Sequence, residues 1–335
     1  MRTHSSGELW KRTKPVGLFC GGMQDPNDLS GGGFGQITYP SASPFEIHHI
    51  LCKMDEAVEH PVFGSLLVPE EPSEGPMPCV VAVHGSLNWR GHHHEHIVRW
   101  LDAGICVFRV HSFDSRSVYS VVEDQMQVTH AMMLADCYQA LRMLATHPSI
   151  DESRIGIAGW SLGGTVALYS AWEPIAESLA PAGERFSAHL SFYPAAHMRT
   201  EVQRWSDRPI LALHGSDDDW VPLKLLEGLV EDLAPHGVDL RVQVYEGAPH
   251  SFDSVEPLDF DPRAIKLDDH RTVAIDSDGN MWGEIEPGVI MPLNEPGDRL
   301  AAFEAIGNLG VHKGVDWGAR KHSLSLACEF LEESL

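Results

Sequence analysis

The sequence predicts an α/β fold with one mostly parallel, doubly wound sheet that is flanked by helices. From about Ile47 onward, short apolar runs alternate with longer segments of helical period, which is typical of strand-helix-strand units. Several of these runs are continuously apolar, as expected of strands that are covered on both faces. With 335 residues, 43% of them apolar, the chain is long enough to bury a sizeable core.

Seven segments carry the strand pattern, and they are residues 57–68, 79–83, 105–110, 154–158, 188–192, 210–213 and 240–245. The clearest helix runs from about 123 to 146, where apolar residues recur at spacings of three and four. A second helix begins near Pro222 and closes at His236-Gly237, where glycine suits a C-terminal cap. The last helix spans about 322–335, and we expect it to return to cover the sheet.

The chain is predicted to form an N-terminal arm, residues 1–44, and a single domain, residues 45–335. The arm is rich in Gly, Ser and Pro and shows no clear period. Between about 255 and 313 the strand-helix rhythm breaks, and the turn Ser277-Asp278-Gly279-Asn280 indicates a hairpin between 273–276 and 281–285. We therefore expect 255–313 to be an insertion before the C-terminal helix that forms a lid or an oligomer contact beside the site.

Composition excludes several classes of partner. The chain has 24 basic and 48 acidic residues, a net charge of −24, which argues against binding to nucleic acid or to an anionic membrane surface. No apolar run approaches the roughly 20 residues of a membrane helix, and the first 40 residues lack the apolar segment of a signal peptide. The six cysteines are dispersed, so we expect reduced thiols and a cytoplasmic location.

The sharpest chemical motif is Gly159-Trp160-Ser161-Leu162-Gly163. A strand pattern over 154–158 runs directly into it, and a helix pattern over 165–169 follows. A serine on such a sharp strand-to-helix turn projects its hydroxyl group, and the flanking glycines avoid collisions between side chains. The motif therefore predicts Ser161 as a nucleophile.

A serine hydroxyl group needs a base and an orienting carboxylate to act as a nucleophile. Asp218 follows the strand that ends near Gly215, and His250 lies on the loop beyond the strand 240–245. Ser161, Asp218 and His250 thus lie past the C-terminal ends of predicted strands, where open parallel sheets collect their sites. Asp217 and Asp219 are alternatives to Asp218 at this point.

With these motifs in place, the chain resembles the α/β-hydrolases of the dienelactone hydrolase-like family over residues 45–254 and 316–335. The resemblance rests on His84-Gly85, Ser112-Phe113-Asp114-Ser115-Arg116, Gly-Trp-Ser161-Leu-Gly-Gly, Gly-x-x-Asp218-x-x-Val-Pro and Pro-His250-Ser-Phe. It implies the α/β-hydrolase fold, a triad in which the carboxylate is Asp218, and no cofactor. Dienelactone hydrolases proper carry a cysteine nucleophile, so Ser161 moves the expectation from dienelactone hydrolysis toward ester hydrolysis.

The predicted oxyanion hole uses the backbone N–H groups of Leu162 and of Ser86 or Leu87. Arg116 either binds a substrate carboxylate with its guanidinium fork or pairs with an acidic neighbour. Three tryptophans fall in or beside site loops, where they either wall a hydrophobic pocket or pack in the core: Trp89, Trp160 and Trp220.

Four histidines lie within residues 92–96, and His92 and His96 have the spacing of neighbours on one helix face. Zinc binding is one interpretation, but the chain lacks a His-Glu-x-x-His motif, so we predict polar residues at the pocket rim and no metal.

The sequence thus predicts a cytoplasmic serine hydrolase that cleaves a small-molecule carboxylic ester or lactone through an acyl-enzyme. The expected partners are that substrate and a second copy of the chain in a homo-oligomer, with no nucleic acid and no membrane. One alternative is a peptidase of the prolyl-oligopeptidase type, although the short segment before Phe45 cannot form the propeller that those enzymes usually carry. Another is a catalytically silent α/β-hydrolase that acts as a binding protein.

Overall fold

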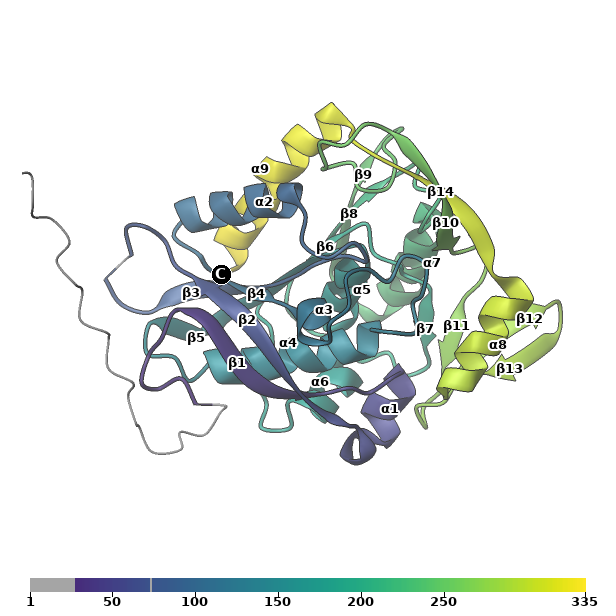
Figure 1. The fold of residues 1–335 in the computed structure, drawn as a ribbon, viewed down its shortest axis with the longest axis horizontal. Helices are drawn as coiled ribbons and strands as arrows, with labels where there is room; N and C mark the ends of the chain where they lie inside the picture. The colour runs from purple at the N-terminus through teal and green to yellow at the C-terminus, as the bar shows by residue number, and fades with distance from the viewer. Residues whose placement is uncertain (1–27, 73) are drawn as a thin grey trace, which may run out of the picture.

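The computed structural model describes residues 28–72 and 74–335 and is built around an eight-stranded sheet in the order β1-β2-β4-β3-β5-β6-β8-β9 (Figure 1). The strands are β1 (Gly35–Ala42), β2 (Glu59–Leu67), β3 (Met77–Val83), β4 (Cys106–Val110), β5 (Ile150–Trp160), β6 (His189–Phe192), β8 (Ile210–Gly215) and β9 (Leu240–Tyr245). β2 is antiparallel to both of its neighbours, and all pairs from β4 to β9 are parallel. The predicted mostly parallel sheet is confirmed, and it contains all seven predicted strands.

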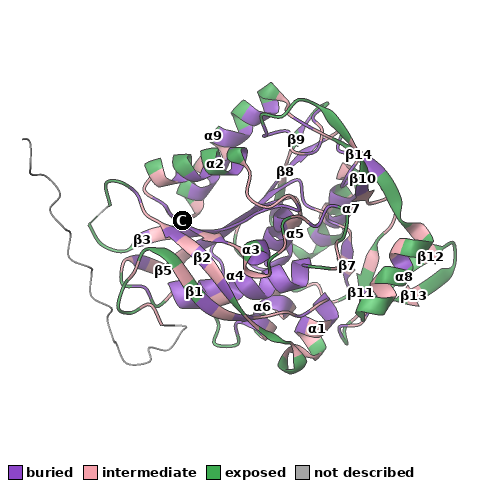
Figure 2. Cartoon of the chain, viewed as in Figure 1, coloured by how far each residue is buried: buried purple, intermediate pink, exposed green. Residues whose placement is uncertain are grey.

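Helices cover both faces of this sheet. One face carries α2 (Gly91–Asp102) and α9 (Trp317–Ser334); the other carries α1 (Ile47–Cys52), α4 (His130–Leu144), α5 (Leu162–Tyr169), α6 (Glu173–Leu179) and α7 (Leu223–Leu233). Alternate residues of β3 enter two separate apolar clusters: Val81 and Val83 pack toward α4, whereas Val80 and Ala82 pack toward α2. Two buried faces explain why the central strands read as continuous apolar runs. Figure 2 shows the buried strands between these layers.

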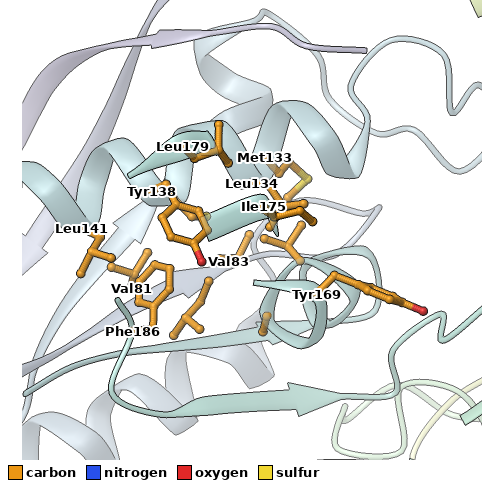
Figure 3. Close-up of a cluster of buried hydrophobic side chains, with 14 of the residues drawn as sticks. Val81, Val83, Met133, Leu134, Tyr138, Leu141, Tyr169, Ile175, Leu179 and Phe186 are labelled. Carbon is orange, nitrogen blue, oxygen red and sulfur yellow. The ribbon is translucent and has the colours of Figure 1, made fainter. Parts of the chain in front are cut away.

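The larger apolar cluster contains α4, whose side chains are buried on almost every side (Figure 3). This helix begins at His130, later than the predicted start near 123. The Thr129 side chain accepts a hydrogen bond from the Met132 backbone N–H group and caps the helix there. The predicted start was wrong because the apolar period lies in 130–144 and does not mark where the first turn begins.

The other two predicted helices are present. α7 runs into a short 3-10 turn, Ala234–His236, and Gly237 follows in a left-handed conformation with φ of 72°, as predicted for a cap. α9 begins at Trp317, earlier than the predicted start near 322, because the Asp316 side chain accepts a hydrogen bond from the Ala319 backbone N–H group.

The predicted boundary of the N-terminal arm is corrected by β1. Residues 35–42, which the sequence analysis placed in the arm, pair with β2 along the edge of the sheet. Tyr39 and Ser41 point inward, and the Ser41 hydroxyl group donates to Asp136 at 2.6 Å. The strand has only a few inward positions and contains Gly35 and Pro40, so its period is hidden in the sequence. Residues 1–27 of the predicted arm lie outside the described residues.

Residues 255–313 form small elements beside the main sheet (Figure 1). β10 (Asp259–Lys266) pairs with β14 (Asn308–Lys313), and α8 (Pro296–Ile306) precedes β14. The predicted hairpin is confirmed as β11 (Val273–Ile275) and β12 (Met281–Glu286), which β13 (Val289–Pro292) extends. β11 also pairs in parallel with β7 (Met198–Thr200), so the segment is joined to the rest of the domain through backbone hydrogen bonds.

The five cysteines in the described part of the chain are free thiols. Within residues 28–72 and 74–335, no helix combines the length and the apolar character needed to cross a bilayer.

Candidate active site

Ser161 lies on the sharp turn between β5 and α5. Its backbone has φ of 54° and ψ of −113°, a conformation that residues with a side chain rarely adopt. A Cβ atom at Gly159 would lie 2.0 Å from the Gly163 carbonyl oxygen, and one at Gly163 would lie 2.3 Å from the Val83 carbonyl oxygen. Only glycine fits at either position, which explains the spacing of the motif.

The structure brings Ser161, His250 and Asp218 into one hydrogen-bonded chain. His250 Nε2 lies 2.9 Å from Ser161 Oγ, and His250 Nδ1 lies 2.7 Å from Asp218 Oδ2. An ionised carboxylate only accepts hydrogen bonds, so Nδ1 carries the proton and donates to Asp218. Nε2 is then free to accept the proton of the Ser161 hydroxyl group.

Asp218 is buried and held as the charged form. Burial disfavours ionisation, but attraction to His250 and the hydrogen bonds from that ring and from the Val221 backbone lower the pKa of Asp218 below its usual value. Its Oδ1 atom accepts from the N–H groups of Trp220 at 3.0 Å and Val221 at 2.9 Å.

The two neighbouring carboxylates point elsewhere. Asp217 accepts a hydrogen bond from Ser216, and Asp219 accepts from the backbone and the ring of His312, at 2.8 Å each. Of the three candidate carboxylates, the structure therefore places Asp218 against His250.

Two hollows meet at Ser161. The larger, of about 200 Å³, lies under residues 265–307 and is named the roofed cavity here. The smaller, of about 40 Å³, lies beside Arg90 and Glu256 and is named the polar cleft. Both are lined by Ser86, Ser161 and Trp220.

The predicted oxyanion residues surround this junction. Leu162 is the first residue of α5, so its backbone N–H group has no carbonyl partner within the helix. Gly85 lies close to the turn that carries Ser161, because a Cβ atom at Gly85 would be 3.0 Å from the Trp160 carbonyl oxygen. The lack of a side chain there lets the next residue, Ser86, lie beside this turn. Leu162 lines the roofed cavity, Leu87 lines the polar cleft and Ser86 lines both.

Arg116 does not reach the site. Its guanidinium group binds Asp136 with both terminal nitrogens, at 2.7 and 3.0 Å, and also donates to the Ala42 carbonyl oxygen. Asp136 is fully buried beneath it. The structure therefore supports the structural interpretation of Arg116 and not its predicted role as a substrate ligand.

The three tryptophans have different surroundings. Trp220 lines both hollows, and its indole N–H group donates to the Ile265 carbonyl oxygen at 3.0 Å. Trp160 is fully buried and lines the polar cleft. Trp89 lines neither hollow; it donates to the Val110 carbonyl oxygen and packs against the rings of His84 and Trp160, so its part is packing.

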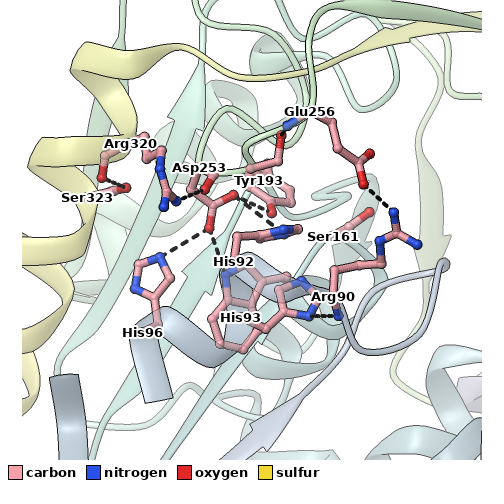
Figure 4. Close-up of polar contacts among 12 residues, drawn as sticks. Arg90, His92, His93, His96, Ser161, Tyr193, Asp253, Glu256, Arg320 and Ser323 are labelled. Atoms are coloured by element: carbon pink, nitrogen blue, oxygen red, sulfur yellow. Dashed lines mark hydrogen bonds and ion pairs between the residues drawn. The ribbon is translucent and has the colours of Figure 1, made fainter. Parts of the chain in front are cut away.

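Two of the histidines of α2, His92 and His96, lie beside Asp253, a buried carboxylate that sequence reasoning missed (Figure 4). His96 Nε2 lies 3.2 Å from Asp253, and the Tyr193 hydroxyl and Trp160 indole groups donate to it at 2.8 and 3.0 Å. His92 Nε2 lies 3.9 Å away. In the described part of the chain, no group of three or more His, Cys, Asp or Glu side chains is arranged to hold a metal ion. In the sequence, the one sign that Asp253 belongs to the site is its position three residues after His250.

Replacing Asp253 with asparagine is expected to lower the free energy of unfolding by roughly 3 kcal/mol at pH 7. Burial opposes ionisation, but His92 and the hydrogen bonds from His96 and Tyr193 lower the pKa of Asp253 to about 2. Because the folded-state pKa is lowered, the charge stabilises the fold above about pH 4, and this contribution is lost as the pH falls toward 2.

Urea unfolding of the wild-type and Asp253→Asn proteins at pH 7 and pH 3 checks this expectation. The difference in the free energy of unfolding between the two proteins should be smaller at pH 3 than at pH 7. Asp207→Asn is the control, because that side chain is 93% exposed. Equal stability of the Asp253→Asn and wild-type proteins at pH 7 would contradict the assigned role.

The segment 255–313 and the residue that follows it are tied to the core at several places near the site. The Gly314 N–H group, directly after β14, donates to the His250 carbonyl oxygen at 2.9 Å. The Leu267 N–H group donates to the Trp220 carbonyl oxygen at 3.1 Å. Arg299 of α8 pairs with the buried Glu46, with Nη2 and Oε2 2.6 Å apart. The segment therefore forms a fixed wall of the roofed cavity.

The chain is similar in sequence to known proteins. The family model described as "Dienelactone hydrolase family" matches residues 64–274. A Bradyrhizobium sp protein named "Probable 2-oxo-3-(5-oxofuran-2-ylidene)propanoate lactonase" is 30% identical over 122 residues, which span 36% of this chain and 48% of that protein. The chain thus matches about half the length of this curated relative.

Two solved structures are similar to the chain. One, from Klebsiella pneumoniae subsp. pneumoniae, carries the dienelactone hydrolase name; it is 19% identical, with a TM-score of 0.46 over 65% of this chain and 88% of that one. The other is a propionate-bound esterase from Thermogutta terrifontis, 18% identical, with a TM-score of 0.45 over 57% of this chain and 80% of that one. Because the family model matches well over half of the sequence, the chain belongs to the dienelactone hydrolase family.

Proposed function

We propose that this protein is a serine hydrolase that cleaves a carboxylic ester or lactone through an acyl-enzyme. The observation that carries the proposal is the continuous chain of hydrogen bonds from Asp218 through His250 to Ser161. Such a chain raises the nucleophilicity of a serine hydroxyl group, which is weak by itself.

In the first half of the reaction, Ser161 Oγ attacks the carbonyl carbon while its proton moves to His250 Nε2. The carbonyl oxygen becomes an oxyanion, which the N–H groups of Leu162 and Ser86 stabilise. The bond from the carbonyl carbon to the alcohol oxygen then breaks, and Nε2 returns the proton to the departing alcohol.

In the second half, a water molecule takes the place of the alcohol. Nε2 accepts one proton of this water as its oxygen attacks the acyl carbon, and then returns the proton to Ser161 as the acid leaves. Asp218 holds the imidazole in the correct tautomer and stabilises its charged form in both halves.

Family membership and the lactonase name of the Bradyrhizobium relative favour an ester or lactone over a peptide as substrate. The hydrogen-bonded chain favours an enzyme over a silent binding protein, because a protein that only binds has no need to align these three side chains. The same family points to a reaction that needs no cofactor. A homo-oligomer remains a prediction.

Replacing Asp218 with asparagine tests the proposal. We expect kcat for p-nitrophenyl butyrate to fall by about 10⁴, because an amide in place of the carboxylate favours the wrong tautomer of His250. Asp219→Asn is the matched control: the neighbouring carboxylate contacts His312 and should tolerate the change. Equal losses in both variants, or full activity in Asp218→Asn, would overturn the proposal.

A further inference from the structure

The two hollows that meet at Ser161 differ in the character of their lining, and the segment 255–313 contributes to both, with Glu256 and Lys313 in the polar cleft. The roof of the roofed cavity comes from 255–313, and its apolar side chains include Leu267, Met281, Ile285, Leu293, Phe303 and Ile306.

Two arginines also line the roofed cavity, and both are neutralised. Arg299 pairs with Glu46, and Arg271 pairs with Asp268 and donates to the Glu284 carbonyl oxygen. Lys266 and Glu284 also line the cavity, and neither is in an ion pair among the described residues. With both arginines engaged and most of the lining apolar, the cavity suits a sizeable apolar group that carries few polar atoms.

The polar cleft has the opposite character. It is lined by Arg90 and Glu256, which form an ion pair across it, and by His92 and Lys313. At about 40 Å³ its volume is a fifth of the 200 Å³ of the roofed cavity. It suits a water molecule or a small alcohol.

The position of His250 shows which of the two hollows can hold a group that exchanges a proton with it. His250 lines the polar cleft but not the roofed cavity. A departing alcohol must receive its proton from His250 Nε2, and the attacking water must give a proton to the same atom. Both therefore have to lie on the cleft side of Ser161, which leaves the roofed cavity for the acyl group that stays bound to Ser161 Oγ.

We infer that the segment 255–313 selects the acyl group, and that the preferred substrates are esters of a medium-length, mainly apolar acid with a small alcohol. This inference rests on the proposed serine hydrolase function and adds its substrate class. The segment acts as a specificity element, because its side chains contact the acyl group and take no part in proton transfer.

Two series of esters, followed by acid release in a pH-stat, test the inference. Methyl esters of acetic, butyric and hexanoic acid vary the acyl group; methyl, butyl and hexyl butyrates vary the alcohol. We expect kcat/KM to rise by about fourfold for each methylene group added to the acid, as burial of apolar surface predicts. Along the alcohol series it should stay level or fall. The reverse pattern would overturn the inference.

Variants locate the selectivity. Leu293→Trp narrows the roofed cavity and should reduce the rise in kcat/KM from butyrate to hexanoate at least fivefold. Phe303→Ala widens the cavity and should extend the rise to octanoate. Arg90→Ala, on the cleft side, is the matched control and should change the alcohol series only. An altered alcohol series with an unaltered acyl series in Leu293→Trp and Phe303→Ala would contradict the assignment.

Failure of this inference differs from failure of the proposed function. If the wild-type protein hydrolyses the esters and Ser161→Ala does not, the triad acts as proposed, and only the order of preference decides the inference. If Ser161→Ala hydrolyses them as fast as the wild type, the proposed function itself fails.

Discussion

The Ser161→Ala variant is expected to lose about 10⁶-fold in kcat toward p-nitrophenyl butyrate while its fold is retained. The substitution removes one oxygen atom, which is the nucleophile, and leaves the turn between β5 and α5 otherwise intact. The backbone keeps its positive φ of 54°, a conformation as unfavourable for alanine as for serine, so we expect little change in Tm. Stopped assays of p-nitrophenol release and a thermal unfolding curve measure the two quantities.

Ser153→Ala is the control for this variant, because Ser153 is an exposed serine on the same strand, β5, and contacts Asp151 only locally. It should retain wild-type kcat. Turnover in Ser161→Ala within tenfold of the wild type would show that another group attacks the ester.

His250→Ala is expected to lose kcat on the same scale, about 10⁶-fold, because no other base lies within hydrogen-bonding distance of Ser161 Oγ among the described residues. The loss should not add to that of Ser161→Ala in the double variant, since the two side chains act as one unit. The measurement is kcat for the two single variants and the double variant with one substrate.

His312→Ala is the matched control for His250→Ala. His312 also pairs with an aspartate, at 2.8 Å from Asp219, but it lies on the surface and outside both hollows. An equal loss of kcat in His312→Ala would mean that disturbance of the segment 255–313 accounts for the effect, and not the loss of a base.

The sheet and the order of the three site residues could be predicted because both follow from local patterns. The central strands are continuous apolar runs. Ser161 follows β5 directly, and Asp218 and His250 lie on the loops after β8 and β9. Parallel strands then bring their C-terminal ends to one edge of the sheet. No knowledge of distant contacts is needed for either step.

The parts that could not be predicted depend on contacts between distant segments. Arg116 is paired with Asp136, and Asp253 is surrounded by His96 and Trp160; neither pairing leaves a spacing in the sequence. The roofed cavity could not be predicted for the same reason. Residues around Ser161 and residues 265–307 line it together, and these segments are far apart along the chain. Helix starts at Thr129 and Asp316 were missed because single capping side chains, not the apolar period, fix them.

Covalent labelling tests the central claim most directly. The wild-type protein is incubated with a fluorophosphonate, digested and analysed by mass spectrometry to locate the adduct. An active serine attacks the phosphorus atom, fluoride leaves, and the serine oxygen keeps the phosphonyl group. We expect one adduct on Ser161 in the wild type and none in Ser161→Ala or His250→Ala. An unlabelled wild-type protein, or an equal adduct on another residue in Ser161→Ala, would contradict the account.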